Sequence, residues 1–128
     1  MVTDLFEILH EDDDLLVLNK PAGLVCHPTK GDERSSLAGR LRIYLGADRP
    51  VHMINRLDRE TSGVVFVGKT DDTARELRQL WESRKVEKQY WAVVHGHVEQ
   101  KEGTIDAPLG ADESSEVAIK DCVRGDGH

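Results

Sequence analysis

Short apolar runs and helical stripes follow one another along this chain. Residues 15–18 (Leu-Leu-Val-Leu) follow an acidic turn, and residues 64–67 (Val-Val-Phe-Val) lie between two glycines. Continuous apolar runs of this length favour fully buried strands over helices. Residues 88–96 and 117–123 are also predicted to be strands, and residues 103–110 a short extended stretch.

Two helices are predicted by apolar spacing and capping residues. Ser35 or Ser36 can cap the first helix, and Gly46 ends it. Its apolar positions are Leu37, Leu41, Tyr44 and Leu45. Thr70 can cap the second helix, where Asp71 and Asp72 complement the helix dipole. Its apolar stripe consists of Ala74, Leu77, Leu80 and Trp81.

The order of these elements predicts the fold class. Strands and helices are intermixed, and the apparent hairpins favour an α+β domain with a mixed, largely antiparallel sheet and flanking helices. Residues 20–23 (Lys-Pro-Ala-Gly) suit a type I turn that the glycine closes. At 128 residues, the chain (1–128) has the size of one domain.

The net charge of −7 is unevenly distributed. Residues 31–69 carry 7 basic and 5 acidic groups, whereas the segments on either side are net acidic. A local arginine-rich face on an acidic body can bind RNA at one place. A solvated helix face is the alternative interpretation of the same charges.

Composition also bears on the compartment. Cys26 and Cys122 give no disulfide framework, which fits a reducing environment. The acidic N-terminus does not resemble a secretory signal, and no apolar run approaches the length of a membrane span. We therefore expect a soluble, cytoplasmic protein without a membrane partner.

The stretch 54–66 (Ile-Asn-Arg-Leu-Asp-Arg-Glu-Thr-Ser-Gly-Val-Val-Phe) places Asp58 between Arg56 and Arg59, before a predicted strand. Neighbouring guanidinium groups favour an ionised carboxylate, which can attack a carbon centre or accept a proton. A turn anchored by a buried strand would hold that group rigidly. The alternative is a surface ion pair between Asp58 and one of the arginines.

Other chemistries fit the sequence less well. The histidines at 95 and 97, with Cys26, His27 and Cys122, match no closed zinc pattern, so no metal site is predicted. No glycine cluster opens a helix with the spacing of a phosphate-binding loop. Ser62 lacks the frame of a nucleophile elbow.

Three ordered motifs resemble the RluA-type pseudouridine synthases of the RluA/RsuA family. The motif Asn-Arg-Leu-Asp-Arg-Glu-Thr-Ser-Gly (55–63) is similar to that family's His-Arg-Leu-Asp-x-x-Thr-Ser-Gly signature. The segment 15–28, with Asn-Lys-Pro-Ala-Gly-Leu, and the segment 85–96, with Lys-Gln-Tyr-Trp-Ala-Val-Val, resemble two further family segments. The resemblance covers nearly the whole chain and implies the N-terminal part of a catalytic domain.

The resemblance implies an isomerase that converts uridine to pseudouridine in rRNA or tRNA, without cofactor or metal. Asp58 would be the catalytic carboxylate, and Tyr90 would stack on the extruded uracil and assist proton transfer. Arg56 would fill the space that the base vacates or contact the RNA. Lesser candidates for phosphate contact are Arg59, Lys88 and Lys20.

Two departures from the family pattern affect these expectations. Asn55 occupies a position where the RluA-type motif usually has His, although a related group carries Gly there. A later family segment, Gly-Arg-Thr-His-Gln-Ile-Arg, has no counterpart, so the sequence is either part of a longer synthase or a natural short paralogue. If it is part of a longer synthase, these 128 residues alone should have little or no activity. The alternative is a non-catalytic RNA-binding or interaction module that self-associates through an exposed sheet edge.

Overall fold

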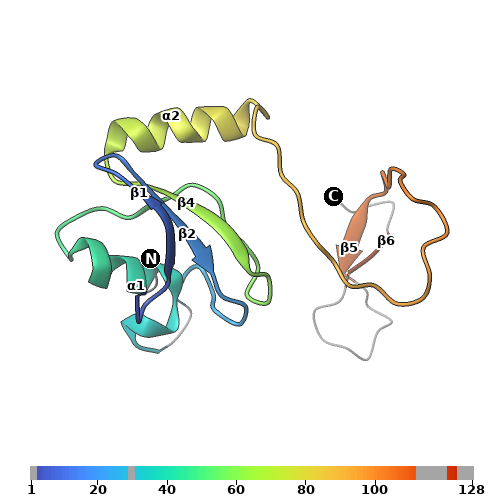
Figure 1. The fold of residues 1–128 in the computed structure, drawn as a ribbon, viewed down its shortest axis with the longest axis horizontal. Coiled ribbons are helices and arrows are strands. Elements are labelled where there is room, and N and C mark those ends of the chain that lie inside the picture. Colours follow the sequence, from blue (N-terminus) through green and yellow to red (C-terminus); the bar gives the residue numbers. More distant parts are fainter. Residues whose placement is uncertain (1–2, 29–30, 112–120, 124–128) are drawn as a thin grey trace. The chain divides into compact units, whose positions relative to one another are not determined.

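The computed structural model describes residues 3–28, 31–111 and 121–123. The chain divides into two units, Met1–Gln89 and Tyr90–His128 (Figure 1). The first unit combines an antiparallel sheet with two α-helices, which confirms the predicted α+β class. None of the helices formed by the described residues is long and apolar enough to span a membrane.

The sheet of the first unit has four strands, and every neighbouring pair is antiparallel. In spatial order they are β1 (Glu7–Glu11), β2 (Leu15–Lys20), β4 (Gly63–Gly68) and β3 (His52–Met53). The predicted strands at 15–18 and 64–67 are thus confirmed as the two central strands. The sequence did not predict the two edge strands, β1 and β3.

Helix α1 (Leu37–Leu45) has the predicted limits. The Ser36 hydroxyl accepts a hydrogen bond from the Gly39 amide at 3.1 Å, which satisfies one of the free N–H groups of the first turn. Gly46 ends the helix at φ 100°, and its amide donates to the Arg42 carbonyl. A short 3₁₀ helix, η1 (Glu33–Ser35), precedes it.

The core lies between α1 and one face of the sheet. Its fully buried members are Leu16, Leu18, Leu37, Leu41, Val65 and Val67. The strand residues of this set alternate along β2 and β4, as expected when side chains on one face of a sheet point to one core. This face therefore supplies the apolar burial that holds the two central strands.

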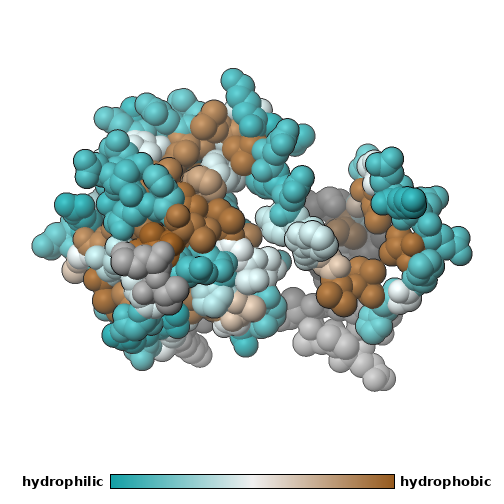
Figure 2. All heavy atoms as spheres, viewed as in Figure 1, coloured by the Kyte–Doolittle hydropathy of each residue, from teal (hydrophilic) through white to brown (hydrophobic). Residues whose placement is uncertain are grey.

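Helix α2 (Asp71–Glu82) packs against the opposite face of β4. The Thr70 hydroxyl accepts from the Thr73 amide at 3.2 Å, as the predicted cap requires. Phe66 and Trp81 make an edge-to-face contact with ring centroids 5.3 Å apart. Helix α2 covers this face of β4 only in part, because Val64 is 47% exposed. The expected full burial of this strand is therefore wrong. Figure 2 shows hydrophobic side chains on the viewed face beneath α2.

The second unit contains a hairpin of β5 (Leu109–Ala111) and β6 (Asp121–Val123). Of the predicted last strand at 117–123, residues 117–120 lie outside the described residues and residues 121–123 form β6. The predicted strand at 88–96 is wrong: these residues pair with no described segment, and Trp91 and Val93 are fully exposed. A strand requires a hydrogen-bonded neighbour, which local composition alone does not provide.

Candidate active site

Asp58 lies on the loop that joins β3 to β4. The amide of Ile54 donates to the Phe66 carbonyl at 2.8 Å, which extends the pairing of these strands by one residue. Leu57 then turns its side chain into the core, with only 9% exposure. Asp58 follows with an exposed side chain. A buried leucine thus anchors the loop directly beside the exposed carboxylate.

The backbone on both sides of Asp58 is hydrogen-bonded to the segment that follows β2. The Cys26 thiol donates to the Leu57 carbonyl at 3.4 Å, and the Gly23 amide donates to the Arg59 carbonyl at 2.7 Å. The Asp58 carbonyl accepts from the Thr61 amide at 3.1 Å, which closes a tight turn. These bonds hold the loop on a rigid part of the unit, as a catalytic group requires.

The Gly23 contact also corrects the predicted turn at residues 20–23. In a closed type I turn the Gly23 amide would donate to the Lys20 carbonyl. Its partner is the Arg59 carbonyl instead, and Gly23 has φ 86°, a conformation that favours glycine. The turn is therefore hydrogen-bonded to the Asp58 loop and is not closed by its own backbone.

Lys20 is fully buried at the end of β2, although the sequence suggested a phosphate contact. Its ammonium group donates to the carbonyl oxygens of Pro21, Leu24 and Arg59 at 2.8, 2.7 and 3.0 Å. A buried cation with three acceptors is not available to an RNA phosphate, so the predicted RNA contact is wrong. Lys20 instead links the turn after β2 to the Asp58 loop.

Burial also lowers the pKa of Lys20, because the charged form loses hydration. Cys26, Glu60 and Asp58 oppose this shift electrostatically. The Asp58 carboxylate therefore lies in the field of a buried ammonium group, in addition to its flanking arginines.

The Asp58 carboxylate has neither a hydrogen bond nor an ion pair within the part of the chain that the structure describes. Arg59 pairs instead with Glu60 at 3.2 Å, and Arg56 is exposed. The alternative of a surface ion pair between Asp58 and Arg56 or Arg59 is therefore not observed. The carboxylate is left open to an incoming group.

Asn55 contacts β4 through both ends of its side-chain amide. Its Nδ2 donates to the Val64 carbonyl at 2.9 Å, and its Oδ1 accepts from the Phe66 amide at 2.9 Å. The sequence identified Asn55 only as a departure from a family pattern. Its contacts depend on the register of β3 against β4, which no local signal gives.

Tyr90 and Lys88 are both exposed, Tyr90 to 65%. Tyr90 begins the second unit, whereas Lys88 and Asp58 belong to the first. An aromatic ring exposed to this extent is free to stack on a base, and an exposed ammonium group is free to meet a phosphate. The roles implied for these two residues therefore stay predictions.

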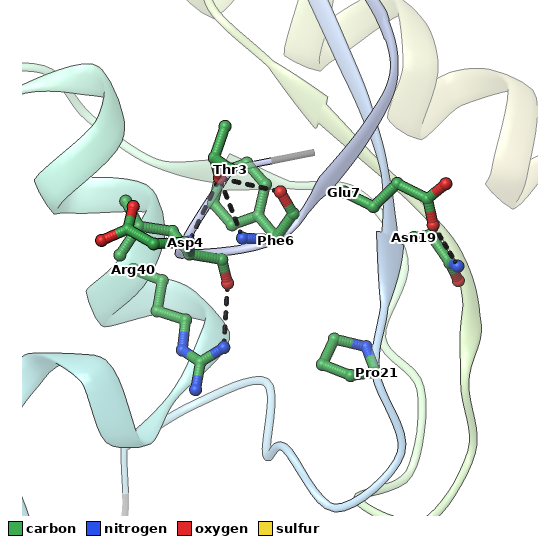
Figure 3. A pocket seen from close by; sticks show the side chains of 8 residues that line it. Thr3, Asp4, Phe6, Glu7, Asn19, Pro21 and Arg40 are labelled. Atoms are coloured by element: carbon green, nitrogen blue, oxygen red, sulfur yellow. Dashed lines mark hydrogen bonds between the residues drawn. The ribbon is translucent and has the colours of Figure 1, made fainter. Parts of the chain in front are cut away.

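A pocket of about 270 Å³ lies at the N-terminal end of β1 (Figure 3). Arg40 at its edge donates to the Leu5 carbonyl at 2.8 Å, and Asn19 donates to the Glu7 carboxylate at 2.8 Å. The polar groups of Arg40 and Asn19 are thus engaged within the unit. Asp58 does not line this pocket, so the pocket is separate from the candidate site. No cluster of three potential metal ligands occurs within residues 3–28, 31–111 and 121–123.

The chain is similar in sequence to a family of RNA-modifying enzymes. The profile of a family described as RNA pseudouridylate synthase matches residues 14–127. An uncharacterized RNA pseudouridine synthase of Mycoplasma genitalium is 38% identical over 89% of the chain and 37% of its own length. The tRNA pseudouridine synthase C of Haemophilus ducreyi is 39% identical over 80% of the chain and 42% of its own length.

The fold has a counterpart among solved structures. Human RNA pseudouridylate synthase domain containing 1 superposes with a TM-score of 0.72 and 25% identity, over 94% of the chain and 45% of that protein. An uncharacterized RNA pseudouridine synthase of Mycoplasma pneumoniae is 39% identical over 80% of the chain. The chain spans between 33% and 42% of the length of these three curated relatives.

Proposed function

Because the chain belongs to the RNA pseudouridylate synthase family, we propose that the protein isomerises uridine to pseudouridine in structured RNA, with Asp58 as the catalytic carboxylate. The observation that carries this proposal is the Asp58 loop: an exposed carboxylate without an ion-pair partner among the described residues, on a backbone hydrogen-bonded on both sides. We further propose that residues 1–128 represent the N-terminal portion of the catalytic domain.

The reaction places two demands on the protein. The target base must leave its stack, since its glycosidic carbon is inaccessible within a helix, and extrusion costs a few kcal/mol. A carboxylate must then reach the sugar, either as a nucleophile or as a base. An open Asp58 on a fixed loop meets the second demand, because little reorganisation is needed when substrate arrives.

Other residues supply the remaining parts of the proposal. Arg56 is exposed two residues before Asp58 and can occupy the space that the base leaves or contact the RNA backbone. Tyr90 can stack on the extruded uracil, and Arg59 and Lys88 can contact phosphates. The RNA substrate is rRNA or tRNA, by analogy with relatives named for these substrates, such as the tRNA pseudouridine synthase C of Haemophilus ducreyi and the ribosomal large subunit pseudouridine synthase D of Zymomonas mobilis.

The test compares wild type with Asp58→Asn, each expressed from the full reading frame that contains this sequence. Turnover is measured as tritium release from rRNA and tRNA that carry uridine tritiated at C5, because the new bond to C5 displaces that hydrogen. We expect release with wild type and loss of at least about a thousandfold with Asp58→Asn, because the variant keeps the size but not the charge of the side chain. The midpoint temperatures of thermal unfolding should be the same for both proteins, since the Asp58 side chain makes no hydrogen bond or ion pair to a described residue.

The second candidate is a non-catalytic RNA-binding or interaction module that can self-associate through a sheet edge. The exposed apolar side chains of the second unit, among them Trp91 and Val93, favour it. Such a module would bind RNA equally well with and without Asp58→Asn and release no tritium in either form. Turnover that is independent of Asp58 would contradict both candidates.

A further inference from the structure

We propose that Asn55 is a positioning residue that determines where the Asp58 loop leaves the sheet. The inference rests on the proposed function of Asp58, but its structural part is tested separately. Asn55 precedes Asp58 by three residues, and neither its donor nor its acceptor faces the loop. Any effect on catalysis must therefore act through the path of the backbone.

The Phe66 amide has an unusual acceptor for a residue in an antiparallel sheet. The pairing of Met53 with Val67 places Ile54 opposite Phe66. Ile54 donates to the Phe66 carbonyl at 2.8 Å, as one half of a regular antiparallel pair. In the other half the Phe66 amide would donate to the Ile54 carbonyl. It donates instead to Asn55 Oδ1 at 2.9 Å, so a side chain replaces a backbone acceptor.

The Val64 carbonyl also accepts from the Asn55 side chain. In a continued ladder the next hydrogen-bonded pair would join Arg56 to Val64, and the Arg56 amide would donate to the Val64 carbonyl. Asn55 Nδ2 makes this bond instead, at 2.9 Å. One amide side chain thus supplies both the acceptor that the Ile54 carbonyl and the donor that the Arg56 amide would provide in a continued strand.

This replacement releases the backbone from the sheet while the Phe66 amide and the Val64 carbonyl keep hydrogen-bond partners. Strand β3 ends at Met53, and by Leu57 the chain has turned into the core. Unpaired backbone groups at this position would cost free energy, so a chain without the amide would favour continued pairing or fraying. Continued pairing would carry Leu57 and Asp58 along β4 and away from the turn that holds Arg59.

The chemistry of the side chain is specific. A donor and an acceptor must lie on the same short group, and only one orientation of the Asn55 amide satisfies both partners. Leucine has a similar size but neither function. Neutral histidine has one donor and one acceptor and is the conservative replacement.

The experiment compares Asn55→Leu, Asn55→His and Thr70→Ala with wild type, all expressed from the full reading frame. Thr70→Ala removes the cap of α2 and serves as a destabilised control that does not touch the loop. Amide hydrogen exchange is followed by NMR at Phe66, whose acceptor is lost, and at Thr61, which donates to the Asp58 carbonyl. Turnover and KM are measured with the same tritiated RNA.

For Asn55→Leu we expect exchange at Phe66 and Thr61 to accelerate by about tenfold or more, and kcat to fall by about tenfold or more with KM within about twofold. Asn55→His should restore both measures, and Thr70→Ala should change neither. Unchanged exchange at Thr61, a loss of kcat no larger than in Thr70→Ala, or equal defects in the leucine and histidine variants would each overturn the proposal. If wild type forms no pseudouridine, the proposed function fails, and exchange at Thr61 still decides whether Asn55 positions the loop.

Discussion

The ammonium group of Lys20 donates a 3.0 Å hydrogen bond to the carbonyl oxygen of Arg59, the residue that directly follows Asp58. The two residues are 39 positions apart in sequence. The same ammonium group holds the carbonyls of Pro21 and Leu24, so one buried cation fixes both the turn after β2 and the loop that carries the candidate catalytic group. Stability of the unit and geometry of the site are therefore coupled at Lys20.

Lys20→Met is expected to lower the free energy of unfolding by about 3 kcal/mol, because three backbone carbonyls lose a buried donor. The measurement is the midpoint of urea unfolding at constant m-value. Arg75→Ala, which removes an exposed ion pair on α2, is the control and should change stability by no more than about 0.5 kcal/mol. A wild-type midpoint for Lys20→Met would show that the ammonium group is not needed to hold the turn.

Gly39→Ala is expected to destabilise the first unit, although alanine is the better helix former by about 1 kcal/mol. A Cβ atom at this position would lie 1.9 Å from the Glu33 carbonyl oxygen, so η1 and α1 must separate. We expect a loss of about 2 kcal/mol, measured by thermal unfolding. Glu33→Ala leaves the same carbonyl in place and should be nearly neutral. Stabilisation by Gly39→Ala would mean that the backbone of η1 moves without cost.

What the sequence could and could not predict follows from the range of the interactions. The limits of α1 were predictable because Ser36, Leu37 and Gly46 act within one or two helical turns. Strand β1 was missed because an irregularity between Ile8 and His10 breaks the alternation of apolar and polar positions. The predicted strand at 88–96 failed because pairing depends on a distant neighbour.

The candidate site divides in the same way. Asp58 was identified from a local motif and its family resemblance, and it proves to be exposed on a fixed loop. Burial of Lys20 was not predictable, since lysine is rarely buried and its acceptor at Arg59 is distant in sequence. The function of Asn55 as a substitute for strand pairing depends on register and not on residue type.

Stability should fall in acid partly through Asp12. A hydrogen bond with His10, then those from the amides of Asp14 and Leu15, lower the pKa of Asp12 from 3.8 to about 2. A carboxyl group with a lower pKa in the folded state contributes stability above its unfolded pKa, and this contribution is lost as pH falls through the folded pKa. The loss therefore belongs to the interval from 3.8 down to about 2.

The check is urea unfolding across this acid range in wild type and Asp12→Asn. The asparagine can still accept from the two backbone amides but cannot titrate, so the midpoint should depend less steeply on pH in the variant. His10→Ala should raise the pKa of Asp12 toward 3.8, because it removes the largest cause of the shift, so the acid loss should be smaller and complete at a higher pH. Identical pH profiles for wild type and Asp12→Asn would contradict the assignment.

Arg56→Ala is expected to weaken RNA binding without a loss of stability. Arg56 is exposed and forms no ion pair with a described residue, whereas the guanidinium group of Arg59 is engaged by Glu60 at 3.2 Å. If Arg56 contacts a phosphate, its removal should reduce the slope of log affinity against log salt by about 0.7 to 0.9. Arg75 is exposed on α2 and paired with Asp72, so Arg75→Ala is the matched control and should leave the slope unchanged.

An unchanged slope with a lower kcat would instead mean that Arg56 fills the space that the extruded base leaves, because a residue in that position acts only after the RNA backbone has bound. An unchanged slope and an unchanged kcat would remove Arg56 from the site.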